Sequence, residues 1–162
     1  MKDMLPSDIV TSGTTVRHKY FNGSERTIIY TDIETSFPEG NLIVSRTDTH
    51  GNILSCNKSF CDMSGFTREE LIGQPHCILR HPDMPTAAFK DLWETVSQGK
   101  YWHGYVKNLR KDGGYYWVYA TIIPNVRNGK IIGYSSIRRQ PSRTKIQEHI
   151  ALYKKMKQQE TT

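Results

Sequence analysis

Three consecutive β-type runs in the C-terminal half of the chain constrain its fold more than any other feature. The run Tyr105–Leu109 alternates between apolar and polar residues and ends at Lys111-Asp-Gly-Gly114, a strong hairpin-turn signal. Residues 115–123 form a long β-branched and aromatic run, and residues 130–138 form another. Strands joined by such short turns pair antiparallel, so this stretch predicts three neighbouring strands of an antiparallel sheet.

Two more strands and two short helices are predicted upstream. Leu42–Arg46 and Ile53–Cys56 flank a turn over residues 48–52 and predict a second hairpin. Asn57–Gly65 predicts a short helix that ends at its glycine. Thr67-Arg-Glu-Glu70 has the spacing of a capping box, so another helical turn is expected to begin there.

A longer helix is predicted from Pro85 to about Gly99, with Phe89, Leu92, Trp93 and Val96 on one face. The order of elements predicts an α+β fold, a five-stranded antiparallel sheet with the helices on one face and a pocket between them. Strands and helices are segregated along the chain, which argues against a doubly wound nucleotide-binding fold.

The chain divides into three parts on this reading. Residues 1–40 form an N-terminal extension in which Asn22-Gly-Ser24, between two β-type runs, predicts a hairpin. Residues 41–140 contain the sheet and the helices. Residues 141–162 form a C-terminal linker with an amphipathic helix over Thr144–Gln159. A lone hairpin and a lone helix are both marginal in water, so each is expected to pack on the domain, on a second copy or on a downstream signalling element.

Composition excludes several classes of protein. The net charge is +6, but the basic residues are spread thinly, so nucleic-acid binding is not expected. The three cysteines are odd in number and form no CxxC pair, so neither a disulfide framework nor a zinc site is indicated. No apolar run approaches the ~18 residues of a membrane span, and the N-terminus has no signal core. We therefore expect a cytoplasmic location without membrane insertion.

The segment Gly73–Pro85 is the strongest candidate for a binding site. It holds three prolines in thirteen residues, and these fix the backbone of a short irregular segment. Arg80, His81 and Asp83 project from it, which suits an anionic or flat ligand. The alternative is that Arg80 pairs with Asp83 and that His81 is a surface residue.

Several motifs together resemble the flavin-binding PAS domain of bacterial aerotaxis receptors, over about residues 42–156. The matching motifs are Asn57-Lys-Ser-Phe60, Ser64-Gly-Phe66, Glu70-Leu-Ile-Gly-Gln-Pro-His76, Arg80-His-Pro-Asp-Met-Pro85, Ala88-Phe89, Leu92-Trp93, Val106-Lys-Asn108, Lys111-Asp-Gly113, Tyr116-Trp-Val118 and Gly133-Tyr-Ser135. The resemblance implies a PAS fold and a redox or oxygen sensor that holds FAD non-covalently, does no net chemistry on a substrate and acts on a signalling partner.

The resemblance also implies roles for individual residues. Arg80, His81 and Asp83 carry over as residues required to retain the flavin: the first two would contact the diphosphate, and Asp83 would orient Arg80 or bond the ribose. Asn57 and Asn108 match positions that line the flavin slot.

Four further residues carry over in the same way. Trp93 and Trp102 match aromatic positions that would flank the ring, and His76 would shape the loop. Thr121 stands where aerotaxis receptors tend to have asparagine, so its contact with the flavin edge would be shorter or water-mediated. The marginal hairpin and helix at the two ends lead us to expect a homodimer through the N-terminal extension, the C-terminal helix or both. The resemblance further implies a downstream chemoreceptor-type segment or a separate partner.

Other readings remain open from the sequence. A haem-binding PAS gas sensor would take an axial nitrogen from His76, His81 or His103. A light sensor needs a cysteine at the offset that His76 occupies, with Cys77 one residue later. A cofactor-free PAS dimerisation module is a further class. An enzyme is not expected, because the sequence has no nucleophile–base spacing, metal cluster or glycine-rich phosphate loop.

Overall fold

The computed structural model describes residues 1–160. The elements follow in the order η1 (Pro6–Asp8), β1 (Thr14–Lys19), β2 (Glu25–Tyr30), β3 (Ile43–Thr47), β4 (Ile53–Cys56), α1 (Lys58–Ser64), α2 (Arg68–Leu71), η2 (His76–Leu79), α3 (Thr86–Val96), β5 (Trp102–Leu109), β6 (Tyr115–Arg127), β7 (Lys130–Arg139) and α4 (Arg143–Glu160).

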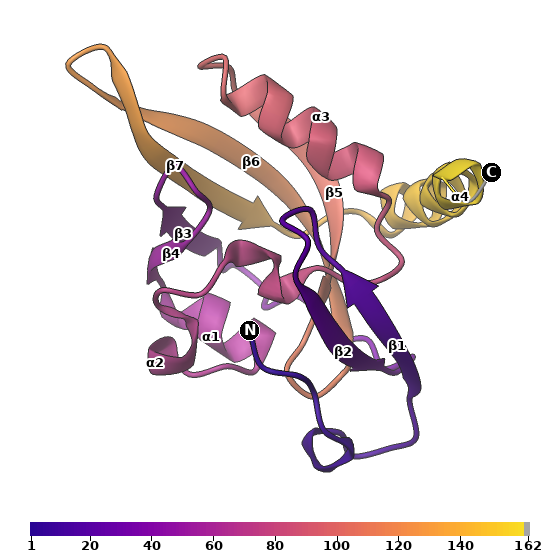
Figure 1. The fold of residues 1–162 in the computed structure, drawn as a ribbon. Helices are drawn as coiled ribbons and strands as arrows, with labels where there is room; N and C mark the ends of the chain where they lie inside the picture. Colours follow the sequence, from indigo (N-terminus) through magenta and orange to yellow (C-terminus); the bar gives the residue numbers. More distant parts are fainter. Residues whose placement is uncertain (161–162) are drawn as a thin grey trace.

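The central sheet has five antiparallel strands in the order β4-β3-β7-β6-β5 (Figure 1). Within this sheet β3–β4, β5–β6 and β6–β7 are hairpins, and β3 pairs with β7 in the middle. The predicted α+β architecture with a five-stranded antiparallel sheet is therefore confirmed. We call the face of the sheet that carries Val118 the inner face, and the face that carries Trp117 the outer face.

The last hairpin is longer than the sequence predicted. A turn was expected to begin at Pro124, but β6 continues to Arg127 and the turn falls at Asn128-Gly129, both with positive φ. Beyond Ile122 the strand has no partner in β5, so its outer edge is free. Proline is tolerated at an unpaired strand edge because no ladder donor is lost there. The hairpin consequently projects beyond the rest of the sheet (Figure 1).

The short helices begin and end at the residues that the sequence indicated. Asn57 caps α1 by accepting from the Phe60 N–H, and Gly65 ends the helix with φ 78°. Thr67 and Glu70 form a reciprocal capping box at α2. These caps satisfy backbone groups that the short helices leave unpaired.

The helix α3 covers the inner face of β5 and β6. Leu92 and Val96 are buried against the sheet, and the Trp102 indole donates to Asp91 on the helix. The main apolar core fills the space between the inner face, α1 and α3, and it continues to Trp117 and to Ile146 and Tyr153 of α4. This arrangement places Trp102 and Asn108 of β5 between the sheet and its covering helices.

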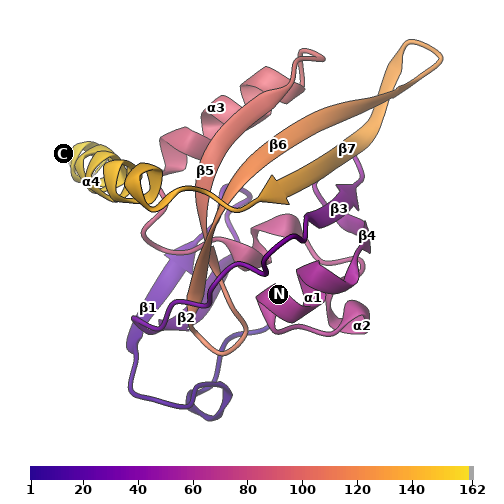
Figure 2. The same cartoon turned by 180° about the vertical axis from the view of Figure 1, so that it is seen from behind.

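The N-terminal hairpin and α4 lie away from α1 and α2 in both views (Figures 1 and 2). The hairpin packs on the domain through Ile28, Ile29 and Leu109. Helix α4 packs on the outer face, where the Tyr153 ring stacks on Trp117. No helix within residues 1–160 is long and apolar enough to cross a membrane. The predicted division at residues 40 and 140 stays a prediction.

Candidate functional site

A cluster of buried polar side chains lies on the inner face of the sheet. We call it the polar cluster; its members are Ser45, His76, Tyr116, Ser136 and Arg138. Arg138 is 3% exposed, and one of its Nη atoms donates to the Ser45 Oγ at 2.9 Å and to the His76 Nε2 at 2.6 Å. Alternation along β7 explains its position, because Arg138 is in phase with the buried Tyr134 and Ser136.

Three buried polar atoms of this cluster have no hydrogen-bond partner within residues 1–160. They are the second Nη of Arg138, the Tyr116 Oη and the Ser136 Oγ. Asn108 is the residue opposite Tyr116 on the neighbouring strand, so its amide lies on the same face of the sheet as the Tyr116 hydroxyl. Unpaired buried polar groups are rare in native proteins because each one costs desolvation free energy, about 1–3 kcal/mol. The cluster therefore has the donors and acceptors for a polar ligand edge.

Among the described residues, Arg138 is a buried cation that has no carboxylate partner. Burial lowers the pKa of Arg138 to about 10, so the side chain remains charged at neutral pH. Burial, and then the charge of Arg138, lower the pKa of His76 to about 3. His76 is thus neutral and accepts from Arg138 through its Nε2. The guanidinium of Arg138 also lies over the Phe60 ring at 5.1 Å, which offsets part of its desolvation cost.

The segment Arg80–Pro85 runs along the free edge of β5. A backbone bridge joins Arg80 to Asn108. The Arg80 side chain is buried, donates to the Met84 carbonyl and the Thr86 hydroxyl, and stacks over Phe89 at 4.7 Å. Its Nε has no partner among the described residues. The expected pairing of Arg80 with Asp83 is not present, since the Arg80 hydrogen bonds go to neutral oxygens.

His81 and Asp83 turn towards the outer side of that edge. The His81 ring is fully buried between Tyr30 and Tyr115, and its Nδ1 accepts from the Asp83 N–H at 3.0 Å. Burial, and then the charge of Lys107, lower the pKa of His81 to about 3. The idea that His81 is a surface residue is therefore wrong.

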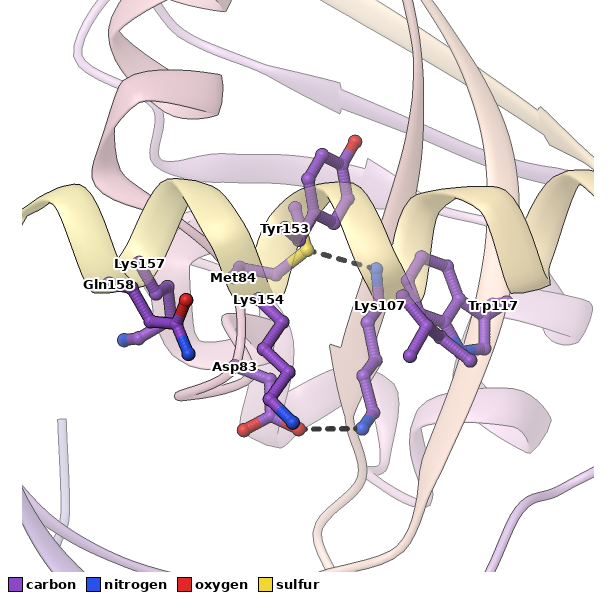
Figure 3. A pocket seen from close by; sticks show the side chains of 9 residues that line it. Asp83, Met84, Lys107, Trp117, Tyr153, Lys154, Lys157 and Gln158 are labelled. Atoms are coloured by element: carbon purple, nitrogen blue, oxygen red, sulfur yellow. Dashed lines mark hydrogen bonds and ion pairs between the residues drawn. The ribbon is translucent and has the colours of Figure 1, made fainter.

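Asp83 forms an ion pair with Lys107 at 2.8 Å instead of with Arg80. Burial alone would raise the pKa of Asp83, but the hydrogen bond from Lys107 and nearby positive charge lower it. Both residues line a cavity of about 470 Å³ that is also lined by α4. Figure 3 shows the pair among the other lining side chains. Trp117 and Tyr153 supply apolar lining there, and lysines line its rim.

The two asparagines differ in what they contact. The Asn57 side chain accepts from the Val44 and Phe60 N–H groups and donates to the Leu42 carbonyl, so its amide is engaged by the chain itself. Asn108 is 4% exposed and lies on the inner face opposite Tyr116. Of the pair, the structure brings Asn108 to the polar cluster.

The two tryptophans lie at different depths around the inner face. Trp102 is buried, and its ring fills the space above Gly104, where a Cβ would lie 2.1 Å from a ring carbon. Trp93 is 41% exposed on α3 and meets the Tyr134 ring edge-on at 5.5 Å. Trp102 is therefore part of the inner wall, and Trp93 is part of the rim.

Thr121 lies on the outer face of the sheet. It is in phase with Trp117 along β6, and its hydroxyl meets the His103 Nδ1 at 3.0 Å. The structure therefore does not bring Thr121 together with the polar cluster.

The central member of the polar cluster, Arg138, was not identified from the sequence. The signal that could have found it is the alternation of 130–138, which places an arginine on the same face as Tyr134. Tyr116 and Ser136 were also missed, because strand alternation was not used to find polar residues on the inner face.

Comparison with known proteins places this geometry in a family context. A family model described as PAS fold matches residues 53–138. The aerotaxis receptor of Escherichia coli (strain K12) is 46% identical over 124 residues, which cover 76% of this chain and 24% of the receptor. The chain thus spans about a quarter of that relative's length.

Solved structures agree with the family match. The PAS domain of a protein from Colwellia psychrerythraea has a TM-score of 0.53 and 28% identity, over 62% of this chain and 86% of that one. A light-oxygen-voltage domain studied with a flavin analogue has a TM-score of 0.60 and 19% identity, over 70% of this chain and 85% of that one. At 19% identity this second likeness shows the fold alone.

Proposed function

The chain belongs to the PAS-fold family, of the type found in aerotaxis receptors, and on that premise we propose that it is a sensor domain that binds FAD non-covalently. The redox state of the flavin would then be passed to a signalling partner or a downstream segment. The domain would perform no net chemistry on a substrate. The flavin, when bound, supplies reversible electron acceptance.

The observation that carries this proposal is the buried, unpaired Nη of Arg138, together with the unpaired Tyr116 and Ser136 hydroxyls on the same face of the sheet. The polar edge of a flavin ring presents carbonyl oxygens and ring nitrogens, so it needs donors and acceptors in one plane and apolar walls on either side. Arg138, Ser136 and Asn108 supply polar groups on the inner face. Phe60 and Trp102 supply aromatic surface there. The residues present therefore fit the group.

Arg80 is the residue that we assign to the diphosphate. It is a buried guanidinium with an unpaired Nε and no carboxylate among its hydrogen-bond partners. An anionic ligand would supply charge-assisted hydrogen bonds that the neutral oxygens of Met84 and Thr86 do not. The bridge between Arg80 and Asn108 makes this site continuous with the inner face.

His81 and Asp83 support that site in different ways. His81 fixes the bend of the segment through its bond from the Asp83 N–H. Asp83 neutralises Lys107 at the same edge, so we assign it to holding Lys107 in place and not to orienting Arg80. Thr121 has no part in this proposal, because it lies on the opposite face.

The same residues would set the redox behaviour of the site. The fixed charge of Arg138 favours the more electron-rich form of any group beside it, because opposite charges attract strongly in a buried environment. Neutral His76 holds the guanidinium in position without cancelling its charge. We therefore expect Arg138 to raise the reduction potential of the bound cofactor.

The segment Arg80–Pro85 also provides a connection to α4. The Lys157 ammonium donates to the Pro82 carbonyl at 2.7 Å, and the Ala87 N–H donates to Glu160 at 3.1 Å. A shift of this segment would change the contacts of α4, which is the element that leads out of the domain. A homodimer through the N-terminal hairpin or α4 belongs to the same proposal, and light scattering of the purified chain tests it.

The visible absorption spectrum of the purified protein tests the proposed cofactor. We expect two broad flavin bands that bleach on addition of dithionite, and FAD as the compound released on denaturation. Arg80→Ala and Asp83→Ala should give folded but colourless protein, with unchanged circular dichroism as the control. A sharp Soret band would instead indicate haem, and a colourless protein that takes up no added FAD would contradict the proposal.

A further inference from the structure

Two cysteine thiols lie in contact at the junction of β4 and α1. The Sγ atoms of Cys56 and Cys61 are 3.8 Å apart. Cys56 is 6% exposed, whereas Cys61 is partly exposed to solvent. The third cysteine, Cys77, lies elsewhere, in η2, with its Sγ 4.0 Å from the Met1 Sδ. Neither Cys56 nor Cys61 takes part in the cofactor site proposed above.

The backbone around Cys56 and Cys61 holds the two residues close enough to form a disulfide. Cys56 is the last residue of β4, and Cys61 lies one turn into α1, with the cap residue Asn57 between them. The Asn57 side chain bonds to Leu42, Val44 and Phe60, so it fixes the start of α1 against the chain at β3. A disulfide has an S–S bond of about 2.05 Å, so the sulfurs must approach by about 1.8 Å. Rotation of the partly exposed Cys61 side chain towards the buried Cys56 sulfur would shorten this distance.

We propose that Cys56 and Cys61 form a reversible disulfide on oxidation by a hydroperoxide, which makes this junction a redox-modification site. In a reducing compartment such a bridge is transient, as redox-sensing disulfides are. The inference goes beyond the proposed cofactor function, because it uses neither the flavin nor the polar cluster.

The accessible thiol reacts first. Burial raises the pKa of Cys56 to about 11, so this residue stays a protonated thiol at neutral pH and is a poor target for peroxide. The Cys61 sulfur attacks one oxygen of hydrogen peroxide, the O–O bond breaks, and Cys61 sulfenic acid and one water are formed. The Cys56 sulfur then attacks the Cys61 sulfur. The S–S bond forms, the S–O bond breaks, and the hydroxyl leaves with the Cys56 proton as a second water.

This sequence balances as a two-electron exchange. Two thiols lose two electrons and two protons, and one peroxide is reduced to two waters. A dithiol reductant reverses the change by thiol–disulfide exchange. The bridge would tie the start of α1 to β4, next to Phe60, whose ring contacts Arg138. Oxidation at the junction would therefore change the surroundings of Phe60, which lies at the edge of the polar cluster.

Peptide mapping of the peroxide-treated full chain tests the proposal. Trypsin cleaves after Lys58, between the two cysteines, so a bridge would link peptides 47–58 and 59–68. After hydrogen peroxide treatment and alkylation, we expect this linked pair, the loss of two of the three free thiols, and their full recovery with dithiothreitol. Cys77→Ala should behave as the wild type does.

Two variants separate the bridge from other oxidation products. Cys56→Ser should stop at sulfenic or sulfinic acid on Cys61, and Cys61→Ser should leave Cys56 unoxidised under the same treatment. Sulfinic acid on Cys61 of the wild type without the linked peptides would overturn the proposal. A bridge that contains Cys77, or three thiols that all survive treatment, would overturn it as well. These outcomes do not depend on whether the chain binds FAD.

Discussion

Replacement of His76 by glutamine should remove a defined part of the pH dependence of folding. The His76 ring is buried in the polar cluster, where it accepts from Arg138. Burial lowers its pKa from the ordinary value of 6.5 to about 3. Below pH 6.5 the unfolded chain binds a proton at this position that the folded chain does not bind. The stability from neutral His76 is therefore fully present above pH 6.5 and is lost as the pH falls from 6.5 towards 3.

The magnitude follows from the same two values. A solution at about pH 5 is about 1.5 units below the pKa of His76 in the unfolded chain. Each unit stabilises the protonated unfolded chain by about 1.36 kcal/mol, whereas the folded chain binds almost no proton there. The wild type should thus lose about 2 kcal/mol through His76 between about pH 7.5 and pH 5. This result needs only that the folded pKa lie well below 5. His76→Gln keeps an acceptor for Arg138 and cannot titrate, so it should not show that loss.

Urea unfolding of the apoprotein at matched ionic strength measures the difference. The free energy of unfolding of the wild type should fall by about 2 kcal/mol more than that of His76→Gln over this pH range. The matched control is His103→Gln, which changes an exposed histidine on the outer face and should follow the wild type. Parallel pH curves for His76→Gln and the wild type would refute the assignment of a buried, neutral His76.

Two further substitutions test how the site is held. Asn57→Ala removes the cap of α1 and the hydrogen bonds to Leu42 and Val44. It should therefore lower the free energy of unfolding, measured with urea, by about 1–2 kcal/mol. An unchanged stability would show that Asn57 does not hold the helix in place. Tyr153→Phe removes the hydroxyl that donates to the Tyr105 carbonyl and should weaken docking of α4 by about 1 kcal/mol. Hydrogen exchange should then speed up in α4 but not in α3, and equal rates in both proteins would contradict this reading.

The sequence predicted the fold well because its signals are local. The capping box at Thr67 and the turn at Lys111-Asp-Gly-Gly114 both depend on residues that are neighbours in the chain. The predicted strand end at Pro124 was wrong because it depends on a strand that is distant in the sequence. Whether a proline ends a strand depends on whether the next strand needs its N–H, and β5 had already ended there.

The site was harder to predict because its contacts join distant residues. Asp83 is three residues from Arg80 but pairs with Lys107 on another element. Arg138 meets His76 across 62 positions of sequence, and nothing local marks either residue as a partner of the other. Period-two alternation alone would have separated Thr121 from Asn108 and placed Arg138 inside.

The central claim is that the unpaired, buried guanidinium of Arg138 receives the polar edge of a flavin. Titration of the wild type and of Arg138→Met with FAD, followed by quenching of flavin fluorescence, tests it most directly. A lost hydrogen bond to a charged group is worth about 1.5–3 kcal/mol, so the account predicts that the dissociation constant rises about 10- to 150-fold in a variant that remains folded by circular dichroism. Equal dissociation constants for the two proteins would contradict it.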